Sequence, residues 1–385
     1  MVLRFIDLNP GDISNRTGNL VRLSGVLYPA FIVKKLPIKV NYDDELVKAI
    51  ADANLSIGNL CGIAVHINPN LLINAYLKKE AVLSSMIEGT RTTLSEVLIH
   101  EQKKKETNDR DLREVMNYID ALWESIEKVK TEPISEELIK SAHKILLSNV
   151  RGETKEPGKY KIRQNWFGRS GDILEASFIP CTPNEVSGLM SNLVVYLEDE
   201  TLTSKLVKAG IMHYQFETIH PFADGNGRIG RLLIMVYLMK SGILKAPLLY
   251  LSAFFERYKD EYIEKLEAVS VKGDLEEWLK FFLKGVKTQA DDALNRAIKL
   301  EKYREECRCI LQSNSDSTTV LSVLDLIFRT AYVSIPQVAK ILKTYYPTAK
   351  YNVDILVKNR ILVLYEDKPR GKIYYAPKVK EILTE

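Results

Sequence analysis

Apolar residues recur at helical spacing along most of the chain, and this pattern predicts a mainly α-helical fold. Leu46, Ala49 and Ala53 lie on one face of a helix that begins at Asp43 or Asp44. Comparable patterns predict further helices at 109–130, 135–149, 182–198, 204–218, 232–242, 252–270, 275–287 and from there to about 309.

Capping residues mark the ends of the second predicted helix and the start of the third. Asn68 and Pro69 form an N-cap and first-turn pair, and the apolar face that follows reaches Met86. Gly89 ends this helix as the glycine after the C-cap. Residues 93 and 96, a threonine and a glutamate, form a capping box that opens the next helix.

The pattern changes between residues 151 and 180, where glycines, aromatic residues and short alternating runs replace the helical spacing. The runs at 160–163 and 176–179, with a polar turn at 169–172 between them, predict a β-hairpin. A short strand is also predicted at 30–34. Thr182 and Glu185 then form a second capping box, which starts the helix at 182.

The last seventy residues predict a separate small domain behind a Ser- and Asn-rich linker at 313–317. Helices are predicted at 319–329, 334–342 and 348–359, and strands at 361–365 and 372–375. This order is typical of a winged helix-turn-helix. From residue 317 onward the chain has eleven Lys and Arg against six Asp and Glu, a net charge of +5, so this module is basic.

Composition places the protein among ordinary globular proteins of more than one domain. The 385 residues are 46% hydrophobic and 27% charged, and the formal net charge of +4 does not by itself indicate nucleic-acid binding. The four cysteines lack the spacing of a zinc site and indicate reduced thiols. The longest apolar run is shorter than the about 18 residues of a membrane span, and the first residues do not resemble a signal peptide. We therefore expect a cytoplasmic protein that does not enter a membrane.

The densest chemistry lies in residues 220–231, directly before an apolar helix. His220 is a candidate general base, because an imidazole near neutrality can accept a proton from a hydroxyl group. Asp224 is a candidate Mg²⁺ ligand. The free N–H groups at the start of the following helix favour a bound phosphate. The candidate phosphate-binding residues are Gly225, Asn226, Gly227, Arg228 and Arg231.

Other interpretations of the same residues are weaker. Residues 225–230 match the G-x-G-x-x-G dinucleotide fingerprint, but they follow a predicted helix and not the strand that this fingerprint requires. The chain contains no Walker-type P-loop. His213, His220 and Asp224 do not make up a closed zinc site, and His213 is expected to be structural.

A second polar feature, Ser84 to Gly89, lies at the end of the second predicted helix. A carboxylate is mildly unfavourable in the last turn of a helix, where the dipole is negative. From this stretch alone, Glu88 is either a solvated side chain beside the helix end or the partner of a cation from elsewhere in the fold. The arginines of residues 220–231 are the obvious cations for the second case.

Residues 220–231 resemble the signature of Fic-domain proteins at every defined position. The matching residues are His220, Pro221, Phe222, Asp224, Gly225, Asn226, Gly227, Arg228 and Arg231. The resemblance extends upstream to 158–160 and 164–166, and downstream to 247–252 and 261–262, and covers most of residues 40–300. Lys161 departs from it, since many relatives have arginine there. The resemblance implies a Fic-type helical bundle with a small β-hairpin flap.

Most Fic proteins transfer AMP from ATP to a hydroxyl side chain of a target protein, and the resemblance implies this activity here. His220 would be the base, Asp224 would hold Mg²⁺, the turn at 225–227 would bind the α- and β-phosphates, and Arg231 would bind the γ-phosphate. Arg228 would support the phosphate site, and Tyr262 falls in the matching downstream segment as a further nucleotide-binding residue. The expected target-docking flap residues are Ser177, Phe178 and Ile179.

The family's inhibitory motif, [S/T]-x-x-x-E-[G/N], matches Ser84, Glu88 and Gly89. With this match, pairing of Glu88 with Arg231 becomes the favoured interpretation, and it would keep ATP in an unproductive pose. Transfer of another phosphate-containing group, or removal of AMP, is also compatible with these residues. A DNA-binding regulator that uses the Fic core as a nucleotide sensor is an alternative of another class.

The expected domains are an N-terminal helical region with the inhibitory helix at 1–105, a Fic catalytic core at 106–295, a helical connector at 296–316 and the winged helix-turn-helix at 317–385. The expected ligands are ATP with Mg²⁺. The expected partners are a target protein, DNA or a protein at residues 317–385, and a second copy of the chain in a homodimer.

Overall fold

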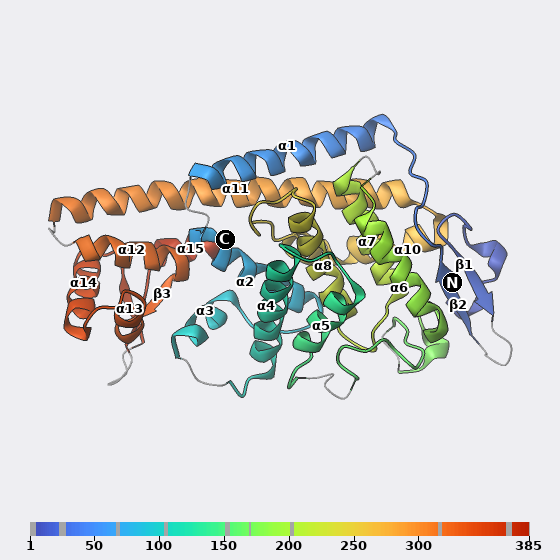
Figure 1. The fold of residues 1–385 in the computed structure, drawn as a ribbon, viewed down its shortest axis with the longest axis horizontal. Helices are drawn as coiled ribbons and strands as arrows, with labels where there is room; N and C mark the ends of the chain where they lie inside the picture. Colours follow the sequence, from blue (N-terminus) through green and yellow to red (C-terminus); the bar gives the residue numbers. More distant parts are fainter. Residues whose placement is uncertain are drawn as a thin grey trace.

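A single 40-residue helix, α11 (Leu275–Asn314), runs along the molecule and connects its parts (Figure 1). The computed structural model describes residues 5–22, 28–66, 70–103, 107–150, 155–168, 171–200, 204–314, 318–366 and 372–384. The sequence pattern predicted two successive helices in this region. They are one helix because Ala290, Ala293 and Ala297 continue the buried face that begins with Trp278.

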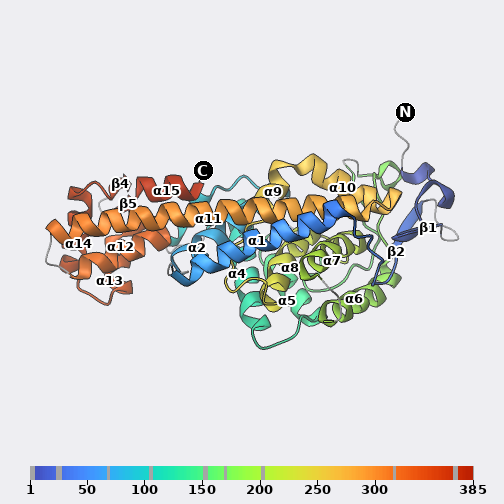
Figure 2. The ribbon, with the colours of Figure 1, turned by 90° about the horizontal axis from the view of Figure 1, so that it is seen from above.

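The first long helix, α1 (Asp44–His66), lies along α11, and Figure 2 shows the two side by side. Its predicted start at Asp43 or Asp44 is confirmed: the Asp43 carboxylate accepts a hydrogen bond of 2.7 Å from the Leu46 amide. Leu46 and Ala53 are fully buried on the predicted apolar face.

The central helices are buried on nearly all sides. α7 (Lys205–Ile219) packs against α8 (Asn226–Lys240), and α8 also contacts α4 and α5. Because α8 is surrounded, it has no polar face, which explains the almost unbroken apolar run after residue 231. The other helices around this centre are α4 (Arg110–Val129), α5 (Glu136–Leu146) and α6 (Pro183–Glu198).

Helix α2 (Asn70–Ile87) crosses the middle of the molecule and packs against α4, α8, α9 (Ser252–Arg257) and α12 (Thr318–Thr330). It is followed by α3 (Leu94–Lys103), which begins with the predicted capping box: the Thr93 amide donates to Glu96 at 2.7 Å, and the Glu96 amide donates to the Thr93 hydroxyl at 3.3 Å. Gly89 has a φ of +99°, as expected for the glycine after a helix end. The predicted cap at 68–69 lies outside the described residues.

Three local predictions differ from the structure. Thr182 makes no side-chain capping bond; only its backbone carbonyl accepts from the Glu185 amide. The helix predicted at 252–270 is divided at Tyr258 into α9 (Ser252–Arg257) and α10 (Lys259–Lys272). Residues 160–163 are not a strand; the predicted hairpin is reduced to one bridge between Phe167 and Phe178.

The predicted strand at 30–34 is β2 (Pro29–Val33), and it pairs antiparallel with β1 (Gly18–Arg22). The sequence analysis missed β1. Its Gly18 packs against the Phe31 ring, which leaves no room for a side chain there. Two 3₁₀ turns, Phe5–Asp7 and Pro10–Asp12, precede this pair, and a third, Ile173–Glu175, lies between Phe167 and Phe178.

The predicted C-terminal helices and strands are present, in the predicted order of three helices followed by a hairpin. A short strand also follows α12, and a helix follows the hairpin. The elements are α12 (Thr318–Thr330), β3 (Tyr332–Ser334), α13 (Ile335–Ile341), α14 (Tyr346–Lys358), β4 (Val363–Glu366), β5 (Ile373–Tyr375) and α15 (Pro377–Thr384). β5 lies between β3 and β4 in an antiparallel sheet. The winged helix-turn-helix assignment stays a prediction. Within the described residues, none of the helices has the length and apolar character that a membrane crossing needs.

Candidate active site

The polar loop between α7 and α8 is a tight turn with a left-handed residue at each end. His220 ends α7 with φ 50° and ψ 61°, and Gly225 precedes α8 with φ 74°. A histidine in this conformation is unusual and indicates that its surroundings hold it there. α8 then begins at Asn226, so its first N–H groups face the loop, as the sequence predicted.

The Asn226 side chain braces the loop from inside. Its amide oxygen accepts from the Phe222 N–H at 2.8 Å, and its amide nitrogen donates to the Phe222 carbonyl, also at 2.8 Å. The residue is 2% exposed. These two bonds use the amide oxygen and one of the two N–H donors of the amide nitrogen. The assignment of Asn226 to a phosphate stays a prediction.

A second brace comes from a segment that sequence reasoning treated only as part of a family resemblance. The Asn165 amide donates to the carbonyls of His220 at 3.2 Å and Phe222 at 2.8 Å. The ammonium group of Lys161 donates to the Asn165 oxygen at 2.7 Å and to the Ile219 carbonyl at 3.3 Å. Burial lowers the pKa of Lys161 to about 8. Lys161 thus supports the loop between α7 and α8 through Asn165.

Replacing Asn165 by alanine is expected to destabilise the loop. The change leaves the His220 and Phe222 carbonyls without these donors, and an unmade bond of this kind costs about 1–3 kcal/mol. The variant should melt at a lower temperature in circular dichroism. Asn54→Ala is the matched control, since the exposed Asn54 amide donates only to its own helix. Equal melting temperatures for the two variants would show that the Asn165 brace does not matter.

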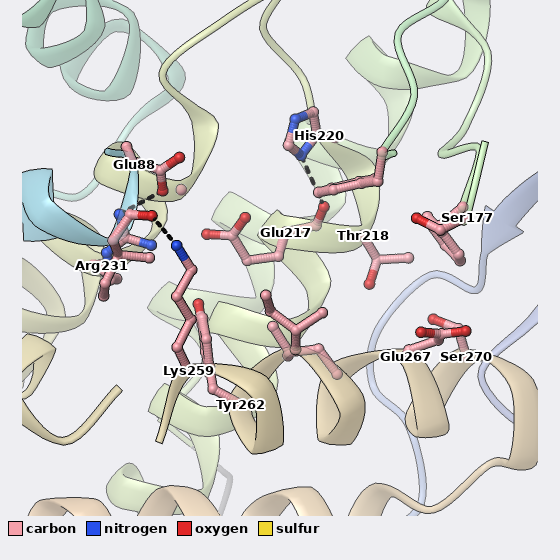
Figure 3. A pocket seen from close by; sticks show the side chains of 16 residues that line it. Glu88, Ser177, Glu217, Thr218, His220, Arg231, Lys259, Tyr262, Glu267 and Ser270 are labelled. Carbon is pink, nitrogen blue, oxygen red and sulfur yellow. Dashed lines mark hydrogen bonds and ion pairs between the residues drawn. The ribbon is translucent and has the colours of Figure 1, made fainter. Parts of the chain in front are cut away.

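The His220 ring has a defined tautomer. Its Nδ1 lies 3.3 Å from the Glu217 backbone carbonyl (Figure 3), which can only accept, so Nδ1 carries the proton and Nε2 has the free lone pair. Burial, with a contribution from Lys161, lowers the pKa of His220 to about 3. His220 is therefore neutral near pH 7, with its proton-accepting nitrogen available.

Asp224 is held through its backbone and leaves its carboxylate beside the start of α8. The His143 Nε2 donates to the Asp224 carbonyl at 2.9 Å, and the Gly158 amide donates to His143 Nδ1 at 2.9 Å. The His143 ring also stacks on Phe222, with 3.8 Å between ring centroids. Sequence reasoning missed His143, which is far from the loop in the chain.

The Asp224 carboxylate fits the expected Mg²⁺. Its side chain is 42% exposed and lies at a helix start that favours phosphate. Mg²⁺ binds through one or two carboxylates together with nucleotide phosphates, so it needs no all-protein cage. Within the described ranges, no group of three or more His, Cys, Asp or Glu residues is placed to hold a metal ion. The structure therefore offers no support for the zinc alternative among these residues.

The two arginines in the first turns of α8, Arg228 and Arg231, have different surroundings. Arg228 forms a buried ion pair of 2.9 Å with Glu114 of α4, and it does not line the cavity described below. Its guanidinium thus links α8 to α4, and its predicted role in nucleotide binding stays a prediction. Glu114 was not predicted, since nothing in the local sequence distinguishes it from the other charged residues of α4.

Arg231 is bound by Ser84, in the last turn of α2, and by Glu88, which directly follows this helix. Its Nε donates to the Ser84 hydroxyl, and its Nη2 donates to the Ser84 carbonyl, both at 2.9 Å. The same Nη2 forms an ion pair of 2.7 Å with Glu88 (Figure 3). The Arg231 side chain is 2% exposed and that of Glu88 is 38% exposed. Glu88 therefore contacts Arg231 of α8 and is not a freely solvated side chain.

The Glu88 carboxylate also covers the start of α8. A Cβ atom added to Gly227 would lie 2.3 Å from Glu88 Oε1, so the carboxylate occupies the space that this glycine leaves open. Burial favours the neutral acid, but the charge and hydrogen bond of Arg231 outweigh it and lower the pKa of Glu88. An ionised carboxylate therefore lies where an anion is favoured at this helix terminus.

Of the residues described so far, Glu88, His220, Gly227 and Arg231 line one cavity of about 320 Å³. Glu88 and Arg231 lie at one end, Ser177, Glu267 and Ser270 lie at the other, and His220 lies between them (Figure 3). The cavity is also lined by residues that the sequence did not predict, among them Lys259, whose ammonium group donates to the Ile87 carbonyl, and Glu217.

Tyr262 lines the cavity as well, and its hydroxyl lies 2.7 Å from the Nε2 of His213. His213 is fully buried, and burial lowers its pKa to about 3. A neutral, buried imidazole bonded to a tyrosine is a structural histidine, which confirms the prediction for His213.

Of the three predicted flap residues, two line the cavity and one lies in the core. Ser177 and Phe178 line the cavity, and Ser177 is exposed. Ile179 is fully buried, and its carbonyl accepts from the Phe31 amide of β2 at 2.8 Å. The expectation that Ile179 docks a target is therefore wrong for its side chain, which faces the core.

Comparison with known proteins identifies related domains. The Fic/DOC family N-terminal model matches residues 47–127, and the Fic/DOC family model matches residues 133–238. A probable protein adenylyltransferase of Aquifex aeolicus, aq_aa38, is 31% identical over 198 residues, which are 50% of this chain and 54% of that protein. Protein adenylyltransferase fic-1 of Caenorhabditis elegans is 31% identical over 199 residues, 46% of this chain and 36% of that protein. The matched part of this chain thus covers about half or less of the length of these relatives.

Among solved structures, a Fic family protein from Desulfovibrio desulfuricans G20 superposes with a TM-score of 0.58 at 21% identity. The superposition covers 88% of this chain and 97% of that one. A fragment of Fic-1 from C. elegans superposes with a TM-score of 0.53 at 23% identity, over 67% of this chain and 74% of that one. These superpositions show a shared fold.

Proposed function

This chain is a Fic-domain protein, and on that premise we propose that it transfers AMP from ATP to a Ser, Thr or Tyr hydroxyl, either of a target protein or of the chain itself. One observation supports this most strongly: a neutral histidine with a free Nε2 shares a cavity with a buried arginine at the start of a helix. This arrangement joins a proton acceptor to an anion site.

In the proposed reaction, the Nε2 of His220 takes the proton of the target hydroxyl as its oxygen attacks the α-phosphorus of ATP. A bond forms between that oxygen and the α-phosphorus, the bond from the α-phosphorus to the pyrophosphate breaks, and pyrophosphate leaves. The backbone of residues 225–227 would bind the α- and β-phosphates, and Arg231 would bind the γ-phosphate. Catalysis would thus rest on positioning and charge stabilisation.

Asp224 would hold Mg²⁺ against the phosphates. When bound, the ion would neutralise charge that develops on the phosphate oxygens. Asp224 suits this role because its carboxylate is partly exposed beside the start of α8, while the backbone contact with His143 fixes its position.

Glu88 would inhibit the reaction within the same chain. It pairs with the guanidinium that the γ-phosphate needs, and its oxygen fills the space at Gly227. A triphosphate could not adopt the productive pose while this carboxylate is in place. Inhibition would end when the last turn of α2 carries Glu88 away from Arg231.

The test uses radiolabelled ATP and Mg²⁺ with the Glu88→Gly variant and a cell lysate. A labelled protein band, followed by mass spectrometry that finds AMP on a hydroxyl side chain, supports the proposal. An adduct of another phosphate-containing group would contradict it and favour the related chemistry. Loss of AMP from a previously labelled target when the unchanged chain is added, but not when Glu88→Gly is added, would indicate removal, in which Glu88 would position water.

The C-terminal unit supports a second candidate, a regulator that binds DNA and uses the Fic core as a nucleotide sensor. The unit carries the +5 charge, and Tyr345, Tyr346 and Tyr351 are exposed on and before α14. Proteins that neutralise DNA phosphates bind more weakly as salt rises. A gel shift with the full chain over a salt series tests this candidate; no salt-sensitive shift would favour a protein partner for the unit.

A further inference from the structure

Two glutamates, and not one, lie against the face of α8 that carries Arg231. Gly230 and Arg231 follow Gly227 by three and four residues, so each of them lies next to Gly227 on the surface of this helix. A Cβ atom at Gly227 would lie 2.3 Å from Glu88 Oε1, and one at Gly230 would lie 2.1 Å from Glu217 Oε1. Each glycine therefore makes room for one carboxyl group, from α2 and from α7.

Only one of these two carboxyl groups is paired. Glu88 bonds to Arg231, whereas the Oε1 of Glu217 is buried and has no hydrogen-bond partner among the described residues. Glu217 as a whole is 9% exposed, and it lines the cavity between Arg231 and His220 (Figure 3). A buried polar atom without a partner, on a residue that lines a cavity, indicates a carboxyl group that a ligand in that cavity can engage.

The charged and titratable groups around Glu217 come from several elements. They are Arg231 of α8, Glu88 of α2, Lys259 and Tyr262 of α10, and His220 at the end of its own helix. Burial raises the pKa of Glu217 to about 8, against the effect of Arg231 and with a further increase from Glu88. In this structure Glu88 provides the negative charge beside Arg231, and Glu217 keeps its proton.

Building on the function proposed above, we propose that Glu217 binds the polyphosphate of the nucleotide as an uncharged hydrogen-bond donor. When both Glu88 and nucleotide are absent, Glu217 loses its proton to solvent and becomes the counter-ion of the buried Arg231. Glu217 is then a nucleotide-binding residue. Because its protonated carboxyl group carries no charge, the polyphosphate can bind beside Arg231 without repulsion from Glu217.

The sign of the pH dependence follows from this exchange. Removal of Glu88 takes away a negative charge, so the pKa of Glu217 falls in the nucleotide-free variant. A bound triphosphate brings negative charge back and raises that pKa, so binding takes up a proton from solvent. Nucleotide affinity is therefore highest below the nucleotide-free pKa and declines as the pH rises above it.

The experiment measures binding of an ATP analogue with a methylene bridge between the α- and β-phosphates, which cannot be cleaved there. Calorimetry compares Glu88→Gly with Glu88→Gly/Glu217→Gln between about pH 7.5 and 9, where the terminal phosphate is already deprotonated. Affinity of the single variant should fall about tenfold more over this range than that of the double variant. Glutamine matches the neutral acid in shape, so the double variant keeps most of the affinity.

Glu267→Gln, in the same Glu88→Gly background, is the matched control. Glu267 lines the far end of the cavity, and burial also raises its pKa, but it is not beside Arg231 (Figure 3). This variant should keep the pH dependence. Equal pH slopes with and without Glu217, or a slope that Glu267→Gln removes, would overturn the inference while leaving the proposed function in place.

Two measurements keep the outcomes distinct. Calorimetry of Glu88→Gly alone in buffers of different ionisation enthalpy counts protons directly, and the absence of proton uptake near pH 8 overturns the inference even if the double variant does not fold. Failure of the analogue to bind Glu88→Gly at every pH would overturn the inference and the proposed function together.

Discussion

Replacing His220 by alanine in the Glu88→Gly background is expected to lower AMP transfer by about 10²- to 10⁴-fold, the range for loss of a general base. The reason is geometric. The Glu217 carbonyl holds the proton on Nδ1, so Nε2 is the atom available to accept the target's proton. Alanine leaves the hydroxyl group without an acceptor, while Arg231 and the start of α8 still bind the nucleotide.

Radiolabel transfer at saturating ATP measures this effect, and binding of the uncleavable analogue is its control. The analogue should bind with nearly unchanged affinity, because His220 is not assigned to the phosphates. A variant that binds the analogue normally and still transfers AMP at the parent rate would contradict the role of His220 as base. A variant that loses binding as well would indicate that the loop conformation depends on the imidazole.

Replacing Glu88 by glycine in the otherwise unchanged chain is expected to raise AMP transfer by about 10- to 100-fold. A hydrogen bond to a charged group contributes about 1.5–3 kcal/mol, and a triphosphate must displace this one to reach Arg231. The substitution also empties the space over Gly227. Initial rates of label incorporation, measured at equal protein concentration, give the ratio.

A graded series distinguishes release of Arg231 from a general loosening of α2. Glu88→Gln keeps the side chain but removes its charge, so its rate should lie between those of the parent and Glu88→Gly. Ser84→Ala removes one hydrogen bond to Arg231 and leaves the ion pair, so its increase should be smaller still. If Ser84→Ala activates as strongly as Glu88→Gly, the charge of Glu88 is not the inhibitory element.

Local signals in the sequence were enough for most helices and for some of their ends. Gly89 and the pair Thr93 and Glu96 behave as predicted because their partners lie within a few residues. Thr182 carries the same signal but makes no capping bond from its side chain, so a local pattern does not guarantee the contact. The division at Tyr258 and the continuity of α11 depend on packing against other elements, which no local pattern contains.

The candidate site also depends on contacts between distant parts of the chain, which local patterns do not contain. The residue types of the loop identified an anion site, but not which side chains serve the loop itself. The Asn226 side chain, predicted as a phosphate ligand, also bonds to the backbone of Phe222 within the loop, and the residue types alone did not indicate this. Asn165, His143 and Glu114 support the loop from far along the chain, and their roles become visible only when the fold brings them together.

The position of α2 has a consequence for how such a protein can change over evolution. The helix that ends in Glu88 packs against both α8 and α12, and Arg296 of α11 donates to the Ile382 carbonyl of α15. Domains exchange most easily where few contacts cross a flexible linker. Here a recombination event that replaced the C-terminal unit alone would leave α2 and α11 with mismatched surfaces. Helix α2 and the C-terminal unit are therefore expected to be inherited together.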